Sequence, residues 1–205
     1  MKKILILITT LVVFCAFTAC TSGNNSDNTN SSENISQSAT EENTFEPIPL
    51  GDFSVQDFDG NILTKDIFKD YDLTMVNLWT TTCSYCIEEM LPLNTIRDEF
   101  QSEGKKINII GICMDIGNTD DINDDNFKIA QEIIKKTGVL YLNIIPDDVL
   151  LLGRLKGIQA FPESFFVDNE GNVITDAHVG ALGKNQWKVL INEEFDKIEK
   201  SLDKE

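Results

Sequence analysis

Hydrophobic and polar positions along the chain follow two spacings, one typical of strands and one typical of helices. Apolar residues that alternate with polar ones predict half-buried strands, and continuous apolar runs predict strands buried on both faces. The strand-like segments are Phe53–Phe58, Ile62–Leu63, Leu73–Leu78, Ile107–Met114, Tyr141–Ile145, Ser164–Asp168 and Asn172–Thr175. The first two and the last two are joined by tight turns, so each pair is predicted to form an antiparallel hairpin.

Segments with helical spacing separate these strands. They are Ile87 to about Phe100, Phe127–Thr137, Asp148–Leu155 and about Lys184 to Ser201. Pro92 lies inside the first segment and is expected to kink that helix or to split off its first turn. The order of elements predicts an α/β fold with a central mixed sheet, helices on both sides and an added N-terminal hairpin.

The N-terminus carries an apolar run that is longer than any of the predicted strands. Two lysines precede the 16 residues Ile4–Ala19, and small residues stand just before Cys20. This pattern predicts an export signal over residues 1–20 and resembles a bacterial lipobox, which implies cleavage before Cys20 and a lipid on that cysteine. An uncleaved signal anchor is the alternative. Both interpretations place the protein outside the cell membrane and tether it there.

The next segment, residues 21–45, is rich in Asn, Ser, Thr and acidic residues. Because it holds too little apolar surface to form a core, it is predicted to be a disordered polar tether. The folded domain is then expected over residues 46–205. The whole chain has 17 Lys and Arg against 34 Asp and Glu, a formal charge of −17. Such an acidic protein is not expected to bind nucleic acid.

The candidate chemistry lies in Cys83-Ser84-Tyr85-Cys86, at the junction of a buried strand and a helix. Unpaired N–H groups and the dipole at a helix N-terminus favour a thiolate, so this position suits a redox-active dithiol. Cys83 is the expected nucleophile, and Cys86, one turn later, is expected to resolve a mixed disulfide.

An inert structural disulfide and half of a zinc site are the alternatives for this pair. A closed zinc site needs four ligands, and the other candidates, Cys113 and His178, are not paired at ligand spacing. His178 is expected in a loop after the second hairpin. Cys113 is expected to be a buried apolar residue of a central strand. We therefore expect no metal or organic cofactor.

Several motifs together resemble membrane-anchored thioredoxin-like proteins of the TlpA/ResA type. They are Val76-Asn77-Leu78-Trp79 before the cysteines, the Cys83–Cys86 pair, Phe161-Pro162 far downstream, and Phe165-Phe166-Val167-Asp168. The resemblance spans about Pro47 to the last helix. It implies a thioredoxin fold and a protein thiol-disulfide oxidoreductase.

The resemblance also implies roles for individual residues. Pro162 would be a cis-proline facing the cysteine pair, and Glu89 would carry protons to or from Cys86. The alternative is that Glu89 is a solvated helix glutamate with no role in the chemistry, as is expected for its neighbour Glu88.

Three aromatic residues are candidates for contact with the substrate. Trp79 would pack beside the cysteines, although core packing alone would explain it. Tyr85 would contact a partner or cover the disulfide. Phe161 stands where the family usually has Thr or Val before the proline.

The predicted function is thiol–disulfide exchange with protein partners, and the resemblance implies that the protein acts as a reductant. The implied clients are apocytochrome cysteines or an exported methionine sulfoxide reductase, and a transmembrane thiol donor would recharge the pair. A peroxiredoxin-like peroxidase and a non-catalytic binding module are the alternatives. The peroxidase motif needs a proline that this loop lacks, and a binding module would not need both thiols.

Overall fold

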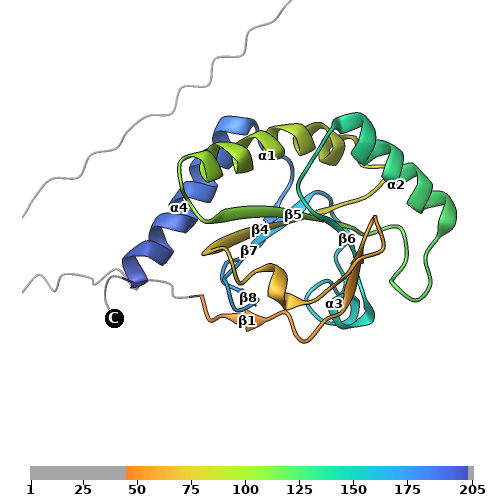
Figure 1. The fold of residues 1–205 in the computed structure, drawn as a ribbon, viewed down its shortest axis with the longest axis horizontal. Helices are drawn as coiled ribbons and strands as arrows, with labels where there is room; N and C mark the ends of the chain where they lie inside the picture. Colours follow the sequence, from red (N-terminus) through yellow and green to blue (C-terminus); the bar gives the residue numbers. More distant parts are fainter. Residues whose placement is uncertain (1–44, 203–205) are drawn as a thin grey trace, which may run out of the picture. The chain divides into compact units, whose positions relative to one another are not determined.

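The computed structural model describes residues 45–202, so the predicted signal and nearly all of the predicted tether lie outside the described residues. Nine strands in this part of the chain form one sheet (Figure 1). They are β1 (Ile48–Pro49), β2 (Val55–Asp57), β3 (Ile62–Leu63), β4 (Leu73–Trp79), β5 (Ile107–Cys113), β6 (Asn143–Ile145), β7 (Glu163–Val167), β8 (Asn172–Val173) and β9 (His178–Val179). The helices are the 3-10 helix η1 (Lys65–Ile67), α1 (Ser84–Ser102), α2 (Asp124–Thr137), α3 (Asp148–Leu152) and α4 (Lys184–Leu202).

The sheet is mixed, as the order of elements predicts. Its strands follow the order β1-β8-β7-β4-β5-β6-β2-β3, and β9 pairs with β7. At the centre, β4 runs parallel to β5 and antiparallel to β7. All seven residues of β4 are buried, and so are all seven of β5. The continuous apolar runs that predicted these strands therefore correspond to burial on both faces of the sheet.

Helices cover both faces, but unequally. Residues of α1, α2 and α4, among them Met90, Ala130 and Trp187, form one core cluster with the sheet. On the other face, Leu150 of α3 packs in a second cluster with Phe53 and Phe68. Figure 1 shows the three long helices on one side of the sheet, with α3 and η1 on the other. No helix within the described residues is long and apolar enough to cross a membrane.

One local expectation is narrowed and another needs correction. Helix α1 continues through Pro92 as one helix, so of the two expected outcomes, a kink or a split, the split does not occur. The chain around His178 is not a loop, because His178 pairs with Ser164 in the two-residue strand β9. A strand of this length shows no alternation that sequence analysis can detect, and only its pairing with β7 defines it.

A close approach between β4, β5 and β6 fixes the indole of Trp79 in the core. The side chain of Trp79 is fully buried, and its Nε1 donates a hydrogen bond of 3.0 Å to Asn143 Oδ1. Gly111 on β5 leaves room for this bond. A Cβ at that position would lie 2.1 Å from Asn143 Oδ1 and 3.1 Å from Trp79 Nε1.

We therefore expect Gly111→Ala to lower the free energy of unfolding by about 2–4 kcal/mol, through overpacking and loss of a buried hydrogen bond. Urea denaturation followed by fluorescence measures this cost. In an Asn143→Ala background, where the nearest atoms are removed, the same change should cost markedly less. Equal costs in the two backgrounds would contradict this account.

Candidate active site

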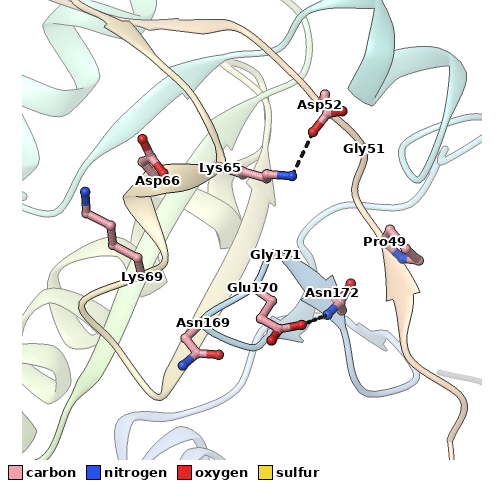
Figure 2. Close-up of a pocket in the computed structure, with 10 residues that line it drawn as sticks. All are labelled: Pro49, Gly51, Asp52, Lys65, Asp66, Lys69, Asn169, Glu170, Gly171 and Asn172. Atoms are coloured by element: carbon pink, nitrogen blue, oxygen red, sulfur yellow. Dashed lines mark hydrogen bonds and ion pairs between the residues drawn. The ribbon is translucent and has the colours of Figure 1, made fainter.

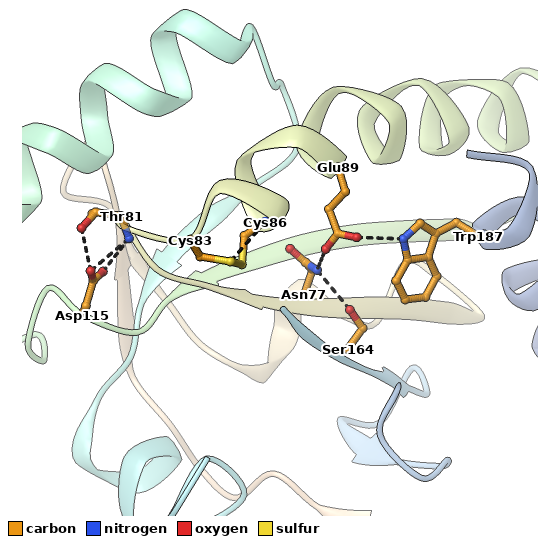
Figure 3. The surroundings of a disulfide bond; sticks show 8 residues. All are labelled: Asn77, Thr81, Cys83, Cys86, Glu89, Asp115, Ser164 and Trp187. Atoms are coloured by element: carbon orange, nitrogen blue, oxygen red, sulfur yellow. Dashed lines mark hydrogen bonds between the residues drawn. A yellow bond between two sulfur atoms is a disulfide. The ribbon is translucent and has the colours of Figure 1, made fainter. Parts of the chain in front are cut away.

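The Cys83–Cys86 pair lies where the central strand β4 passes into helix α1. Cys83 is the N-cap residue of α1, and its sulfur accepts a hydrogen bond of 3.2 Å from the backbone N–H of Cys86. The two residues form a disulfide, with their Cα atoms 5.3 Å apart (Figure 3). Cys86 is fully buried, whereas Cys83 is partly exposed. A partner sulfur can therefore reach Cys83 more readily than Cys86.

The start of α1 stabilises negative charge on Cys83 once the pair is reduced. The first turn holds no acidic side chain, and its unpaired N–H groups point toward the N-cap. The N–H of Cys86 already donates to this sulfur in the disulfide form. These are the conditions under which a cysteine becomes a nucleophilic thiolate.

Glu89 is a buried carboxyl group, not a solvated helix glutamate. Its residue is only 3% exposed, and its two oxygens accept hydrogen bonds from Asn77 Nδ2 at 2.8 Å and Trp187 Nε1 at 3.0 Å (Figure 3). Burial raises the pKa of Glu89 above its ordinary value, although the hydrogen bonds from Trp187, Asn77 and the backbone at Leu182 oppose that shift. A carboxyl group with a raised pKa beside a cysteine pair is suited to exchanging protons with it.

The peptide bond between Phe161 and Pro162 is cis, as the resemblance implies. Pro162 directly precedes β7, and Glu163 on β7 pairs with Leu78 on β4. Since the two strands are antiparallel, Pro162 lies at the edge of the sheet where β4 leads into the cysteine loop. Its carbonyl oxygen accepts a hydrogen bond of 2.8 Å from the N–H of Gly180. Sheet pairing thus brings Cys83 and Pro162, which are 79 positions apart, to one edge of the sheet.

The three aromatic candidates occupy different environments. Tyr85, between the two cysteines, is 68% exposed, and Phe161 is partly exposed. Trp79 is fully buried, so a partner would meet it only through the residues that cover it. A groove of about 220 Å³ beside the start of α1 is lined by Tyr85, Glu88, Glu89, Pro92, Ala181, Leu182, Gly183 and Lys184.

Comparison with known proteins shows what the whole chain is similar to. No family model matches the chain. A thiol:disulfide interchange protein DsbE of Haemophilus influenzae is 26% identical over 152 residues, which cover 74% of this chain and 75% of the relative. The chain is DsbE-like, has the thioredoxin fold, and is a thiol-disulfide oxidoreductase.

Solved structures confirm the fold of the DsbE-like protein. A thioredoxin-family thiol:disulfide interchange protein from Chlorobium tepidum superposes with a TM-score of 0.59 at 21% identity, covering 73% of this chain and 97% of that one. The exposed lipoprotein thioredoxin of Streptococcus pneumoniae superposes with a TM-score of 0.53 at 18% identity, covering 70% and 99%. The predicted thioredoxin fold with additional N-terminal strands is correct.

Sequence analysis did not identify the side chains that hold Glu89 in the DsbE-like protein. Asn77 donates to Glu89 and also to Ser164 Oγ at 3.0 Å, and Trp187 reaches Glu89 from the C-terminal helix. An asparagine inside an apolar strand was a detectable signal for Asn77. Trp187 follows the apolar face of its helix, so nothing in the sequence distinguished it from an ordinary core residue.

The free thiol of the described residues, that of Cys113, and a surface pocket both lie outside the site. Cys113 is buried at the end of β5, and burial together with the charge of Asp115 raises the pKa of its thiol, which makes it unreactive. Among the described residues, no group of three or more His, Cys, Asp or Glu side chains is placed to hold a metal ion.

A pocket of about 610 Å³ lies between β1, η1 and the β7–β8 turn (Figure 2). It contains an ion pair of 2.8 Å between Lys65 and Asp52 and none of the predicted site residues.

The raised pKa of Glu89 predicts a pH-dependent stability for the oxidised DsbE-like protein. The folded state binds the proton more tightly than the unfolded chain, for which the reference pKa is 4.5. Protonation therefore stabilises the fold, and this contribution is lost as the pH rises from about 4.5 through the folded-state pKa. Relative to Glu89→Gln, wild type should lose stability across that window in denaturant titrations.

Glu88→Gln is the matched control, because Glu88 is exposed and adjacent in the same helix. It should show the same pH dependence of stability as wild type. A constant difference between wild type and Glu89→Gln at all pH values would show that Glu89 does not bind a proton on folding.

Proposed function

We propose that the protein is an exported, membrane-tethered reductant of disulfides in other proteins. The observation that carries the direction of electron flow is the buried carboxyl group of Glu89, one helical turn after Cys86. A nearby carboxylate opposes thiolate formation, so it disfavours the reduced pair and favours the disulfide. A pair that prefers its disulfide passes its electrons to partners.

The proposed reaction begins with both cysteines reduced. The Cys83 thiolate attacks one sulfur of the partner disulfide, whose S–S bond breaks, and the departing sulfur takes the electron pair and a proton from solvent. Cys86 then loses its proton and attacks Cys83 in the mixed disulfide. The Cys83–Cys86 bond forms, the second partner sulfur leaves as a thiol, and the partner has gained two electrons and two protons.

The remaining residues have proposed roles in these steps. Glu89 accepts the proton of Cys86, since its carboxyl group is buried and has a raised pKa. Pro162 and Phe161 present the edge of the sheet to the partner, and the exposed ring of Tyr85 contacts it. Trp79, which is buried in the core, supports the loop that carries Cys83. The clients implied by the sequence resemblance are apocytochrome cysteines or an exported methionine sulfoxide reductase.

The tether rests on the sequence. Residues 1–20 have the pattern of a lipoprotein signal, with Cys20 as the lipid attachment site. One structural relative is itself described as an exposed lipoprotein thioredoxin. Anchored in this way, the domain would stay at the outer face of the cell membrane, where a transmembrane thiol donor can reduce it again.

The reduction potential of the Cys83–Cys86 pair tests the direction of electron flow. Equilibration with glutathione or dithiothreitol should give a value below about −250 mV, typical of a reductant. Wild type should reduce insulin, and Cys83→Ser should not. A potential near about −120 mV would identify an oxidant instead. Equal activity of wild type and Cys83→Ser would contradict exchange through this pair.

Lipid labelling tests the anchor. The wild-type chain should incorporate a labelled fatty acid and remain in the membrane fraction, and Cys20→Ala should lose the label. If the signal is an uncleaved anchor instead, both chains should lack the label, keep their full length and stay with the membrane. Cys15→Ala is the control, because this cysteine lies within the signal and should not change labelling.

A further inference from the structure

A second carboxylate, that of Asp115, binds the loop that carries the nucleophile. Its two oxygens both accept a hydrogen bond from the backbone N–H of Thr81, each at 3.0 Å, and one of them also accepts from Thr81 Oγ1 at 2.6 Å. Figure 3 shows this contact on the other side of the disulfide from Glu89. Thr81 is buried, so these bonds satisfy donors that have little access to water.

The contact continues the central sheet beyond its last backbone pair. Strands β4 and β5 pair as far as Trp79 and Cys113, and the N–H of Met114 donates to the carbonyl of Trp79 at 2.8 Å. Beyond this point the segment after β4 leads to α1 and the segment after β5 leads to α2. The side chain of Asp115 takes the place of the next backbone acceptor and holds Thr81 beside β5.

Thr81 lies inside the turn that ends at the nucleophile. The N–H of Cys83 donates to the carbonyl of Thr80 at 3.2 Å, which closes a four-residue turn with Thr81 as its second residue. The N–H of Thr81 has no acceptor within that turn. Asp115 accepts this hydrogen bond and therefore fixes Thr81, which the hydrogen bond of the turn does not hold.

Asp115 is itself held in place. Its backbone carbonyl accepts a hydrogen bond of 2.6 Å from Asn126 Nδ2 on α2, and its carboxylate accepts one of 3.4 Å from the buried thiol of Cys113. Asn123, the N-cap of α2, donates its N–H to the carbonyl of Ile116 at 2.9 Å. Residues at the start of α2 therefore hold the backbone at Asp115 and Ile116 in place.

We propose that Asp115 is a positioning residue, which acts through Thr81 to hold Cys83 at the N-cap of α1, within bonding distance of Cys86. Its effect is on the closure of the disulfide, an intramolecular step whose equilibrium depends on how closely the two sulfurs are held together. This role concerns exchange in either direction, so it does not depend on whether the protein is a reductant.

The test compares reduction potentials of the full-length chain, purified in detergent, at pH 7 and 25 °C. Thr81→Val removes the hydroxyl donor and keeps the charge of Asp115 and the shape of the side chain. Asp115→Asn replaces one acceptor oxygen by an amide NH2 group, which is a donor and cannot accept a hydrogen bond from Thr81. Each variant should close its disulfide with an equilibrium constant about tenfold smaller, which moves the potential about 30 mV toward positive values.

Asp120→Asn is the matched control for charge, because Asp120 is an exposed residue of the same β5–α2 loop. It should keep the wild-type potential. Thermal unfolding of the oxidised chains separates positioning from general stability. If Thr81→Val and Asp115→Asn lower the unfolding temperature but keep the wild-type potential, the contact is only structural and the proposal is wrong. The difference in reduction potential between variant and wild type tests the role of Asp115, whereas the wild-type potential itself tests the direction of electron flow.

Discussion

The pairing of β4 with β5 on one side and with β7 on the other determines where Cys83, Pro162 and Asp115 lie. Because β4 is buried along its whole length, its register with both neighbours is strongly specified. Its carboxyl end delivers Cys83 to the start of α1. The start of β7 brings Pro162 to the same edge, and the end of β5 places Asp115 beside the loop. A change of register would separate all three.

Two carboxyl groups flank the cysteine pair and differ in how they meet the cost of burial. Glu89 is almost completely buried, and the cost of a desolvated charge raises its pKa. Asp115 is only partly buried, and three hydrogen bonds from Thr81 satisfy its oxygens. Glu89 is therefore suited to exchanging a proton, and Asp115 is suited to holding a loop.

The contrast among the cysteines shows that reactivity follows position in the fold. Cys83 caps a helix and is partly exposed, so its thiolate is stabilised and accessible. Cys86 is buried one turn later, where it can reach Cys83 but not a partner. Cys113 is buried at the end of a strand and donates to a carboxylate, which keeps it protonated. The three residues are chemically identical and differ only in their surroundings.

The sequence alone determined the four α-helices and all the strands except β1 and β9, because apolar spacing reports burial directly, and it located the Cys83–Cys86 pair at a strand–helix junction. It also indicated Glu89 and Pro162, but only through resemblance to a family. The tertiary structure decided what surrounds them. Trp187 donates to Glu89 across 98 positions and Thr81 to Asp115 across 34. Such contacts leave no periodic pattern in the sequence, since they depend on how distant elements pack against one another.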